Sequence, residues 1–438
     1  MTALLRELIR NGCVNDGTVA SGHEERNAAV LLASLAGPGL DIERYEPQPG
    51  RASVVARIEG SDPAAPTLVL LGHTDVVPAN PDGWRRDPFG GEVADGVIWG
   101  RGAVDMLNLT ASMALATRHL ADSGWRPRGT LVFAAVADEE ALGDHGAGWL
   151  TEHEWDAVGG EFVITESGGV PVTTPAGTRL HVTVGEKGAM WCTLRVHGTS
   201  GHASRPLRTD NALVSAARLV GRLAEFQGPV LIGDAWRRYV AGMGLDEDLR
   251  AALTDPARVD EAVERMPSVD LARVAHACTH TTMAPTVMRG GTKTNVIPDR
   301  VDLDVDIRAL PGQTADDVRS LLLDAIGPDL GAKVEIIELV DDPATLSPVD
   351  TPLWDALTAV SSRLSPGTTC LPTMTSGATD ARFYRRKGAI AYGFGLFSDR
   401  MTIDQFSAMF HGDDERIDIE SLRLSVELWE ALARRFLD

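Results

Sequence analysis

The sequence predicts an α/β fold in which a larger α/β domain with a mixed sheet is interrupted by a smaller α+β domain. Two observations predict it. Short, nearly all-apolar runs alternate with helical patterns in the first half of the chain, whereas the strand-like runs after residue 181 are longer. The first pattern returns after a proline-containing stretch at 341–352. We therefore expect residues 1–184 and 344–438 to form the larger domain, with residues 185–343 inserted into it.

The elements of the larger domain follow from its apolar patterns. An amphipathic helix is expected first, because the apolar residues near the N-terminus share one helical face: Leu4, Leu5, Leu8 and Ile9. Buried strands are expected at 67–72, 130–137 and 161–165, and helices at 109–120, 353–364 and 419–436. Because a helix separates successive strands, at least some of them should pair in parallel.

The inserted segment has the element order β-α-β-β-α-β, which can fold as its own sheet with helices on one face. The expected strands lie at 181–185, 190–197, 281–289, 300–309 and 333–340, and the helices at 211–227 and 314–326. The second helix starts with Thr314-Ala-Asp-Asp317, a typical capping sequence. Residues 246–273 are charged, helix-prone and long for a connection, so they are interpreted as a helical insertion.

Composition excludes several classes of protein. The 438 residues include 41 Lys+Arg and 62 Asp+Glu, and the net charge of −21 disfavours binding of nucleic acid or an anionic membrane through overall charge. No uninterrupted apolar run is long enough to span a bilayer, and the N-terminus lacks the basic start and apolar core of a signal peptide. The four cysteines have no C-x-x-C spacing, so neither a disulfide framework nor a thiolate metal site is expected. These features favour a cytoplasmic protein.

Candidate functional residues lie at the ends of predicted strands, where open α/β sheets bind their ligands. His73 follows the strand at 67–72, and Asp75 points to the same side of an extended chain, where it could accept the other ring N–H. Asp105 lies in a glycine-rich segment before the helix at 109–120. Taken alone, each is also explained by ordinary loop hydrogen bonds or by helix capping.

Further acids and a second histidine complete the set. Asp138, Glu139 and Glu140 end the strand at 130–137, Glu166 follows the strand at 161–165, and His411 lies near the C-terminus. Adjacent acids repel one another, and a bound cation would convert this repulsion into coordination. Since neighbours in an extended segment point to opposite sides, one acid can bind metal while the next acts as a general base. The mixed nitrogen and oxygen set suits zinc or a similar divalent ion, with room for two ions that share a carboxylate.

Taken together, the ordered motifs are similar to those of the M20 family of metallopeptidases and amidohydrolases. This family includes aminoacylases, succinyl-diaminopimelate desuccinylase, acetylornithine deacetylase and glutamate carboxypeptidases. The matching motifs are Gly72-His-Thr-Asp-Val-Val-Pro78, Gly100-Arg-Gly-Ala-Val-Asp105, Asp138-Glu-Glu140, Glu166, Gly198-Thr-Ser-Gly-His-Ala-Ser-Arg-Pro206 and His411-Gly-Asp-Asp-Glu415. The resemblance implies a zinc-exopeptidase-like catalytic domain interrupted by a lid or dimerisation domain.

The resemblance also implies a site with two divalent metal ions, Zn²⁺ or Co²⁺. His73 and Glu166 would hold one ion, Glu140 and His411 the other, and Asp105 would bridge the two. Asp75 would orient His73, and Glu139 would be the general base that passes a proton from the attacking water to the leaving amine. A cis peptide bond is implied between Asp105 and Met106.

Residues of the inserted domain are implied to contact the substrate. His202 would stabilise the developing oxyanion, from the partner subunit in dimeric members, and Asn295 and Arg308 would bind a carboxylate of the substrate. Gly377 matches a glycine of a substrate loop. A homodimer formed through the inserted domain is therefore expected, although the helical insertion could instead act as a lid of a monomer.

The sequence thus predicts a hydrolase that cleaves the amide bond of an N-acyl amino acid or a short peptide with a free carboxylate. A carboxypeptidase or dipeptidase is not separated from a deacylase. The alternatives are a non-catalytic module, which the presence of all expected ligands and of Glu139 disfavours, and a member that makes amide bonds or processes a specialised metabolite. The segment Asp105-Met-Leu-Asn108 and the insertion at 246–273 depart from many members and can reshape the substrate cleft.

Overall fold

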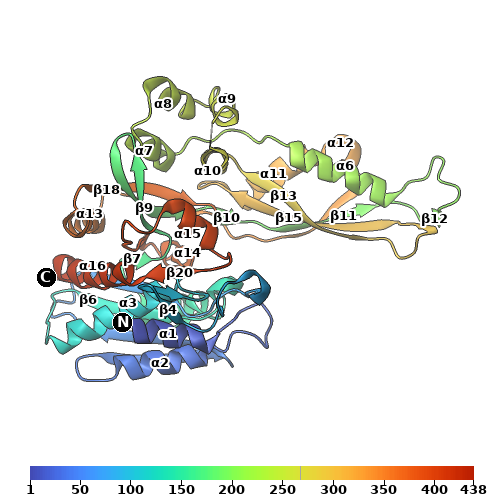
Figure 1. Ribbon diagram of the computed structural model, residues 1–438. Coiled ribbons are helices and arrows are strands. Elements are labelled where there is room, and N and C mark those ends of the chain that lie inside the picture. Colours follow the sequence, from blue (N-terminus) through green and yellow to red (C-terminus); the bar gives the residue numbers. More distant parts are fainter. Residues whose placement is uncertain (267) are drawn as a thin grey trace.

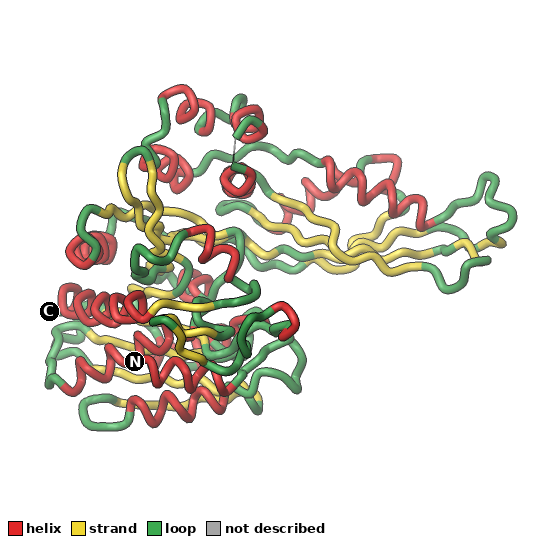
Figure 2. Tube along the Cα trace, in the orientation of Figure 1, coloured by secondary structure: helices red, strands yellow, loops and turns green. Residues whose placement is uncertain are grey.

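Two separate sheets organise the protein, and the smaller one projects away from the larger (Figures 1 and 2). The computed structural model describes residues 1–266 and 268–438. The strands of the larger sheet, in spatial order, are β1 (Asp41–Gln48), β2 (Arg51–Ile58), β6 (Thr130–Val136), β3 (Thr67–His73), β7 (Phe162–Thr165), β19 (Ile390–Gly393), β9 (Gly177–Glu186) and β17 (Thr345–Leu346), with β8 (Gly168–Thr174) and β18 (Thr368–Thr375) also paired to β9. Strand β3 pairs in parallel with both β6 and β7, which confirms the predicted parallel pairing.

Helices cover both faces of the larger sheet. One face packs against α1 (Thr2–Asn11), α2 (Glu25–Leu35), α3 (Leu107–Asp122), α13 (Pro352–Leu364) and α16 (Ile419–Leu437), and the other against α4 (Ala147–His153), α5 (Trp155–Val158) and α14 (Ala381–Arg386). Successive residues of β6 enter opposite cores, since Phe133 belongs to the first cluster and Val132 to the second. The all-apolar run at 130–137 is therefore explained by burial on both sides.

The smaller sheet confirms the predicted β-α-β-β-α-β unit. Its strands are β13 (Thr282–Gly290), β15 (Arg300–Ala309), β11 (Cys192–His197) and β16 (Val334–Leu339), with β10 (Gly188–Ala189) also paired to β15. The helices α6 (Ala212–Glu225), α11 (Ala315–Ile326) and α12 (Pro328–Gly331) share a single apolar core with one face of this sheet. The predicted capping box is present, because Thr314 and Asp317 exchange side-chain-to-backbone hydrogen bonds.

The helical insertion exists and is larger than the predicted 246–273. It consists of α7 (Asp234–Gly242), α8 (Glu247–Leu253), α9 (Val259–Glu264) and α10 (Val269–Thr279), which share a small apolar cluster of their own. Leu371 of β18 completes this cluster, so the insertion rests on the edge of the larger sheet.

Shorter elements complete the architecture. They are β4 (Glu92–Ala94), β5 (Val97–Trp99) and β20 (Arg416–Asp418) in a three-stranded sheet, β12 (Gly201–His202) and β14 (Val296–Ile297) in a two-stranded one, α15 (Ile403–Met409), and the 3₁₀ turns at Pro81–Gly83 and Glu139–Ala141. Among the described residues, no helix combines the length and apolarity needed to cross a membrane.

Candidate active site

Three neighbouring strands of the larger sheet end beside one another, and each carries candidate residues at its end. Strand β3 ends at His73, β6 ends two residues before Asp138, and β7 ends directly before Glu166. Because β3 lies between the other two and is parallel to both, their carboxyl ends meet at the same edge. Asp105 joins them from the segment before α3. Its peptide bond to Met106 is cis, as the resemblance implied.

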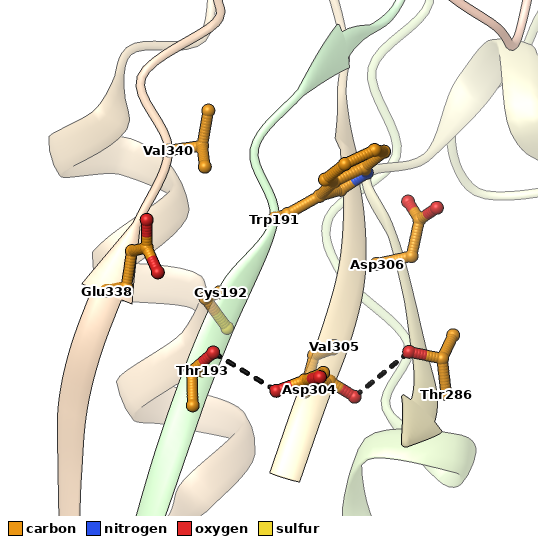
Figure 3. A pocket seen from close by; sticks show the side chains of 9 residues that line it. All are labelled: Trp191, Cys192, Thr193, Thr286, Asp304, Val305, Asp306, Glu338 and Val340. Carbon is orange, nitrogen blue, oxygen red and sulfur yellow. Dashed lines mark hydrogen bonds between the residues drawn. The ribbon is translucent and has the colours of Figure 1, made fainter. Parts of the chain in front are cut away.

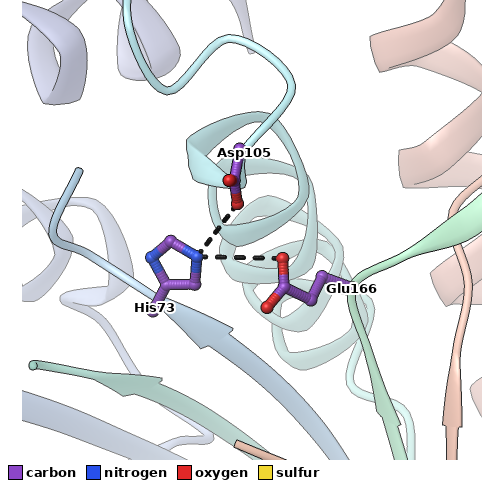
Figure 4. A group of neighbouring side chains, drawn as sticks. All are labelled: His73, Asp105 and Glu166. Carbon is purple, nitrogen blue, oxygen red and sulfur yellow. Dashed lines mark hydrogen bonds and ion pairs between the residues drawn. The ribbon is translucent and has the colours of Figure 1, made fainter. Parts of the chain in front are cut away.

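The first group of possible metal ligands is His73, Asp105 and Glu166, all buried (Figure 4). The His73 Nε2 atom lies 3.3 Å from Asp105 Oδ1 and 3.9 Å from Glu166 Oε2. Figure 4 shows the imidazole edge turned toward both carboxylates. One ligand atom from each residue lies within 4.8 Å of the others, as required for binding a common ion.

The second group shares Asp105 with the first and adds Glu140 and His411. The His411 Nε2 atom lies 3.0 Å from Asp105 Oδ2 and 3.3 Å from Glu140 Oε2. The two oxygens of Asp105 thus face different histidines. Two ions bridged by the Asp105 carboxylate would fit this arrangement.

The electrostatics of the two groups also favour a bound cation. Burial, together with repulsion from Asp105, raises the pKa of Glu140 and of Glu166 to about 7. Hydrogen bonds to Asp105 and Glu140 raise the pKa of His411 to about 10. Glu140 Oε1 and Glu166 Oε2 are buried without a hydrogen-bond partner among the described residues. Divalent cations would stabilise these carboxylates in the charged form and give both orphaned oxygens a partner.

Asp75 lies behind His73, on the side away from the ligand groups. Its Oδ1 atom is 3.5 Å from His73 Nδ1, and its backbone carbonyl oxygen is 3.0 Å from the same nitrogen. The Asp75 carboxylate also accepts the backbone N–H groups of Glu139 at 3.2 Å and Glu140 at 3.1 Å. Asp75 therefore ties the end of β3 to the acidic segment after β6, a wider role than orienting one imidazole.

A pocket of about 260 Å³ opens over the ligand groups. Its lining includes the predicted residues Glu139, Arg308 and Gly377 together with Trp191 and Arg382. Burial and repulsion from Glu166 raise the pKa of Glu139 well above its ordinary value. The structure thus brings the predicted base and two of the predicted substrate contacts to the same cavity as the possible metal ligands.

His202 and Asn295 lie elsewhere. His202 lies in β12, which pairs with β14, and Asn295 directly precedes β14. This two-stranded sheet is at the end of the smaller sheet that is farthest from the larger one (Figure 1). Both are exposed, and the Asn295 carbonyl accepts the backbone N–H of Ala203 at 3.1 Å. The His202 Nδ1 atom accepts the backbone N–H of Ser204 at 3.2 Å and lies 2.8 Å from the Ser204 hydroxyl oxygen. These two predicted contacts are therefore close to each other and lie away from the possible metal ligands of their own chain.

Sequence reasoning missed the buried Glu415, although it quoted the motif that contains it. The Glu415 carboxylate accepts backbone N–H groups from Gly102 at 3.0 Å, Val104 at 2.6 Å and Asp105 at 3.0 Å, and an Arg101 Nη1–H at 2.8 Å. It thus holds the segment that carries the shared ligand. Asn15, which donates to Asp75 at 2.9 Å, was also missed. The available signal was an acid at the end of His411-Gly-Asp-Asp-Glu415, but its buried partners are distant in sequence.

Comparison with known proteins defines the class to which this fold and site belong. The profile of Peptidase family M20/M25/M40 matches residues 69–435, and the chain belongs to this family of hydrolases. The N-fatty-acyl-amino acid synthase/hydrolase PM20D1 of Xenopus tropicalis is 28% identical, over 95% of this chain and 83% of that protein. A succinyl-diaminopimelate desuccinylase of Maricaulis maris is 37% identical over a shorter region, which covers 44% of this chain and 48% of that protein.

Solved structures share the fold over the whole length. An M20 family metallo-carboxypeptidase from Sulfolobus solfataricus superposes with a TM-score of 0.73 at 19% identity, covering 99% of this chain and 98% of that one. Human carnosine dipeptidase 1 superposes with a TM-score of 0.70 at 17% identity, covering 99% and 95%. At these identities the likeness supports the architecture, namely a mixed α/β domain and a smaller second domain.

Proposed function

We propose that the protein hydrolyses the amide bond of N-acyl amino acids or short peptides that carry a free carboxylate, with two Zn²⁺ ions in the site. The observation that carries the proposal is the shared position of Asp105 between two ligand groups, in a pocket that also contains Glu139 and Arg308. Co²⁺ would suit the same mixed nitrogen and oxygen ligands.

In this proposal each residue has a distinct role. His73 and Glu166 would hold one ion, Glu140 and His411 would hold the other, and Asp105 would contribute to both. Bound divalent ions would lower the pKa of the attacking water and polarise the carbonyl. Glu139 accepts the proton of that water while the oxygen bonds to the carbonyl carbon. Glu139 then gives the proton to the nitrogen as the C–N bond breaks, which releases a carboxylic acid and an amine.

Arg308 is the proposed anchor for the carboxylate of the substrate. The second guanidinium of the pocket, Arg382, is already engaged, because its Nη1 donates to the Thr379 carbonyl and its Nη2 to the Leu142 carbonyl. Arg308 uses Nε and Nη2 for Asp306, and its Nη1 has no hydrogen-bond partner among the described residues. Gly377 lines the same pocket, and without a side chain it would let the backbone come close to the substrate.

The proposal also ranks the substrates and the direction of the reaction, which is amide hydrolysis or amide synthesis. N-acyl amino acids are the first candidates because the relatives from Xenopus tropicalis and Maricaulis maris are named for acyl-amino acid substrates. Amide synthesis is the second candidate, favoured by the word synthase in the first of these names. Cleavage of dipeptides or of a C-terminal residue is the third, by analogy with the carboxypeptidase and dipeptidase folds.

We further propose that residues 1–184 and 344–438 form the catalytic domain, and residues 185–343 the domain that closes the site and forms a homodimer. The outer edge of β13 is unpaired among the described residues, and Val287 and Met288 on it are half exposed. In a dimer, His202 and Asn295 of one subunit would complete the site of the other. A cytoplasmic location is also proposed, supported by four cysteines that are all buried free thiols.

The test is an assay of metal-stripped protein reloaded with Zn²⁺ or Co²⁺, using N-acetyl and N-fatty-acyl amino acids and dipeptides as substrates. We expect hydrolysis that depends on the added ion, with two ions bound per chain by elemental analysis. The reverse reaction is followed with a free fatty acid and an amino acid. A well-folded protein that binds no divalent ion, or that is reloaded with two and cleaves none of these amides, would contradict the proposal.

A further inference from the structure

We propose that Asp306 is a positioning residue, which holds the Arg308 guanidinium so that its Nη1 atom faces the substrate carboxylate, and that Trp191 supports one face of that guanidinium. The inference rests on the proposed function, in which Arg308 anchors the carboxylate. It adds Asp306, a residue that would affect the reaction by holding Arg308 and not by contacting the substrate.

The geometry of the pair supports this role. Arg308 Nε donates to Asp306 Oδ1 at 2.7 Å and Nη2 donates to Oδ2 at 3.1 Å. This bidentate contact fixes the plane of the guanidinium and occupies its Nε edge. The edge that contains Nη1 remains for a second carboxylate. An arginine can thus bind one carboxylate of the protein and one of the substrate at the same time.

The pair is built into the strand. Asp306 and Arg308 are two residues apart on β15, so they project from the same face, whereas Val305 and Ile307 enter the core under the helices. Trp191 follows β10, whose Ala189 pairs with Arg308 across the sheet. The Arg308 Cζ atom lies 5.7 Å from the centre of the Trp191 ring, in cation–π range.

The position of each residue relative to the pocket shows which side Asp306 occupies. Arg308 lines the pocket over the metal ligands, whereas Asp306 lines a neighbouring cavity of about 370 Å³ (Figure 3). Trp191 lines both. Asp306 therefore approaches the guanidinium from the neighbouring cavity and leaves the catalytic pocket open.

The charges of the pocket explain why Arg308 needs a partner. The pocket also contains the carboxylates of Asp105, Glu139, Glu140 and Glu166. A mobile arginine would be attracted to these groups, and a pair with Glu139 would occupy both the base and the anchor. Asp306 offers a closer carboxylate outside the catalytic pocket, so the guanidinium stays available to the substrate without contacting the base.

The experiment compares Asp306→Asn with the wild type on two matched substrates, the best-cleaved N-acyl amino acid and its carboxamide. We expect Asp306→Asn to raise KM for the acid about tenfold, with kcat changed by less than about threefold. KM for the carboxamide should not move, because the anchor has no charge to bind there. In an Arg308→Ala background the same substitution should have no further effect on KM.

Three results would overturn the inference. A lower KM of the variant for the acid would mean that Asp306 competes with the substrate carboxylate. An equal change in KM for the acid and for the carboxamide would mean that the substitution distorts the pocket in general. Effects on KM that add to those of Arg308→Ala would mean that Asp306 acts by another route. Asp302→Asn is the matched control. Asp302 lies on the same face of β15 and binds Arg195 with the same fork, at 2.8 and 3.0 Å, outside the pocket. It should leave both KM values unchanged.

Failure of the proposed function is distinguishable from failure of this inference. If the wild type hydrolyses none of the amides, the proposed function fails, and calorimetric binding of N-acetyl-leucine and N-acetyl-leucinamide to the zinc-loaded protein still tests the pair. Weaker binding of the acid alone by Asp306→Asn would then support the positioning role. Equal binding of the acid by the variant and the wild type would overturn it.

Discussion

At the scale of single residues, Glu139 is the group on which the proposed chemistry depends. Its carboxyl lines the pocket and is not needed for either of the two ligand groups around Asp105. We predict that Glu139→Gln lowers kcat by about 10²- to 10⁴-fold, because an amide cannot accept the proton of water, while both ions remain bound. Turnover and metal content of the same sample provide the measurement. Full activity in a metal-loaded variant would reject Glu139 as the base.

Glu415 leads to a prediction about metal binding instead of turnover. Its side chain is fully buried and accepts three backbone N–H groups from the segment that ends in Asp105. Glu415→Gln places an NH₂ group among those donors, so the shared ligand should shift and metal affinity should fall roughly 10- to 100-fold. Zinc titration against a competing chelator measures the change. Asp414→Asn is the control, since the neighbouring Asp414 accepts a hydrogen bond from Arg85 near the surface. Equal zinc affinities of Glu415→Gln and the wild type would show that Glu415 plays no part in metal binding.

At this scale the sequence predicted which candidate ligands lie together, but it did not predict the residues that hold those ligands in place. His73, Asp105, Glu140, Glu166 and His411 lie where the motifs predicted them. Such residues are recognisable because ligand chemistry restricts each to a few side-chain types at a strand end. Glu415 and Asn15 act through hydrogen bonds to distant backbone or side-chain atoms. A single sequence carries no signal for such a partner until the fold has placed the two segments side by side.

At the scale of elements, the contact between β9 and α7 contains a histidine that should make stability depend on pH. His181 is packed against Tyr239, its Nε2 is buried without a hydrogen-bond partner among the described residues, and burial lowers its pKa from 6.5 to about 4. Between those values the unfolded chain binds a proton that the folded protein does not. Stability should therefore rise as the pH increases from about 4 to 6.5.

His181→Phe removes this proton binding and keeps an aromatic ring beside Tyr239. We predict that the free energy of unfolding of the metal-free variant depends less on pH in that window, by up to about 1.4 kcal/mol per pH unit. Urea unfolding at several pH values from 4.5 to 7 checks it. The same substitution at His153, an exposed residue of α4, is the control. Identical slopes for His181→Phe and the wild type would mean that His181 does not contribute.

Elements buried on both faces were the most predictable. Strands β3 and β6 were expected to within one residue at each end, because every residue of β6 is buried and the pattern is apolar throughout. Strand β1, in contrast, lies at the edge of the larger sheet and carries exposed charged residues such as Glu43 and Arg44, so its sequence resembles a loop. Strand β18 contains Pro372, which weakens the strand signal. Pairing with the rest of the sheet, not local propensity, makes both of them strands.

At the scale of the whole molecule, the distance between His202 and the metal ligands leads to a test of the proposed dimer. If His202 acts in the site of the partner subunit, inactive Glu139→Gln and inactive His202→Ala subunits should complement each other when mixed. Each mixed dimer would have one intact site, so random exchange should restore about a quarter of the wild-type activity.

The control for complementation is a mixture of Glu139→Gln with Glu140→Gln. Both substitutions lie in the same pocket, so no mixed dimer would contain an intact site and no activity should return. Light scattering on each sample establishes the oligomeric state. A monomer, or a dimer in which the first mixture stays inactive, would contradict the sharing of sites between subunits.

The way in which the chain passes between the two sheets has a further consequence. It leaves the larger sheet along β9 and returns along β17, and these strands are paired, with Glu186 opposite Thr345 and Gly185 opposite Leu346. In topological terms the smaller sheet therefore belongs to one long insertion, whose two ends lie side by side at the edge of the larger sheet. The entropy cost of bringing the two ends of such an insertion together depends only weakly on its length. Evolution can lengthen, trim or exchange it without reordering the strands that carry His73 and Glu166, so that substrate preference can diverge in this architecture while the hydrolytic chemistry is inherited intact.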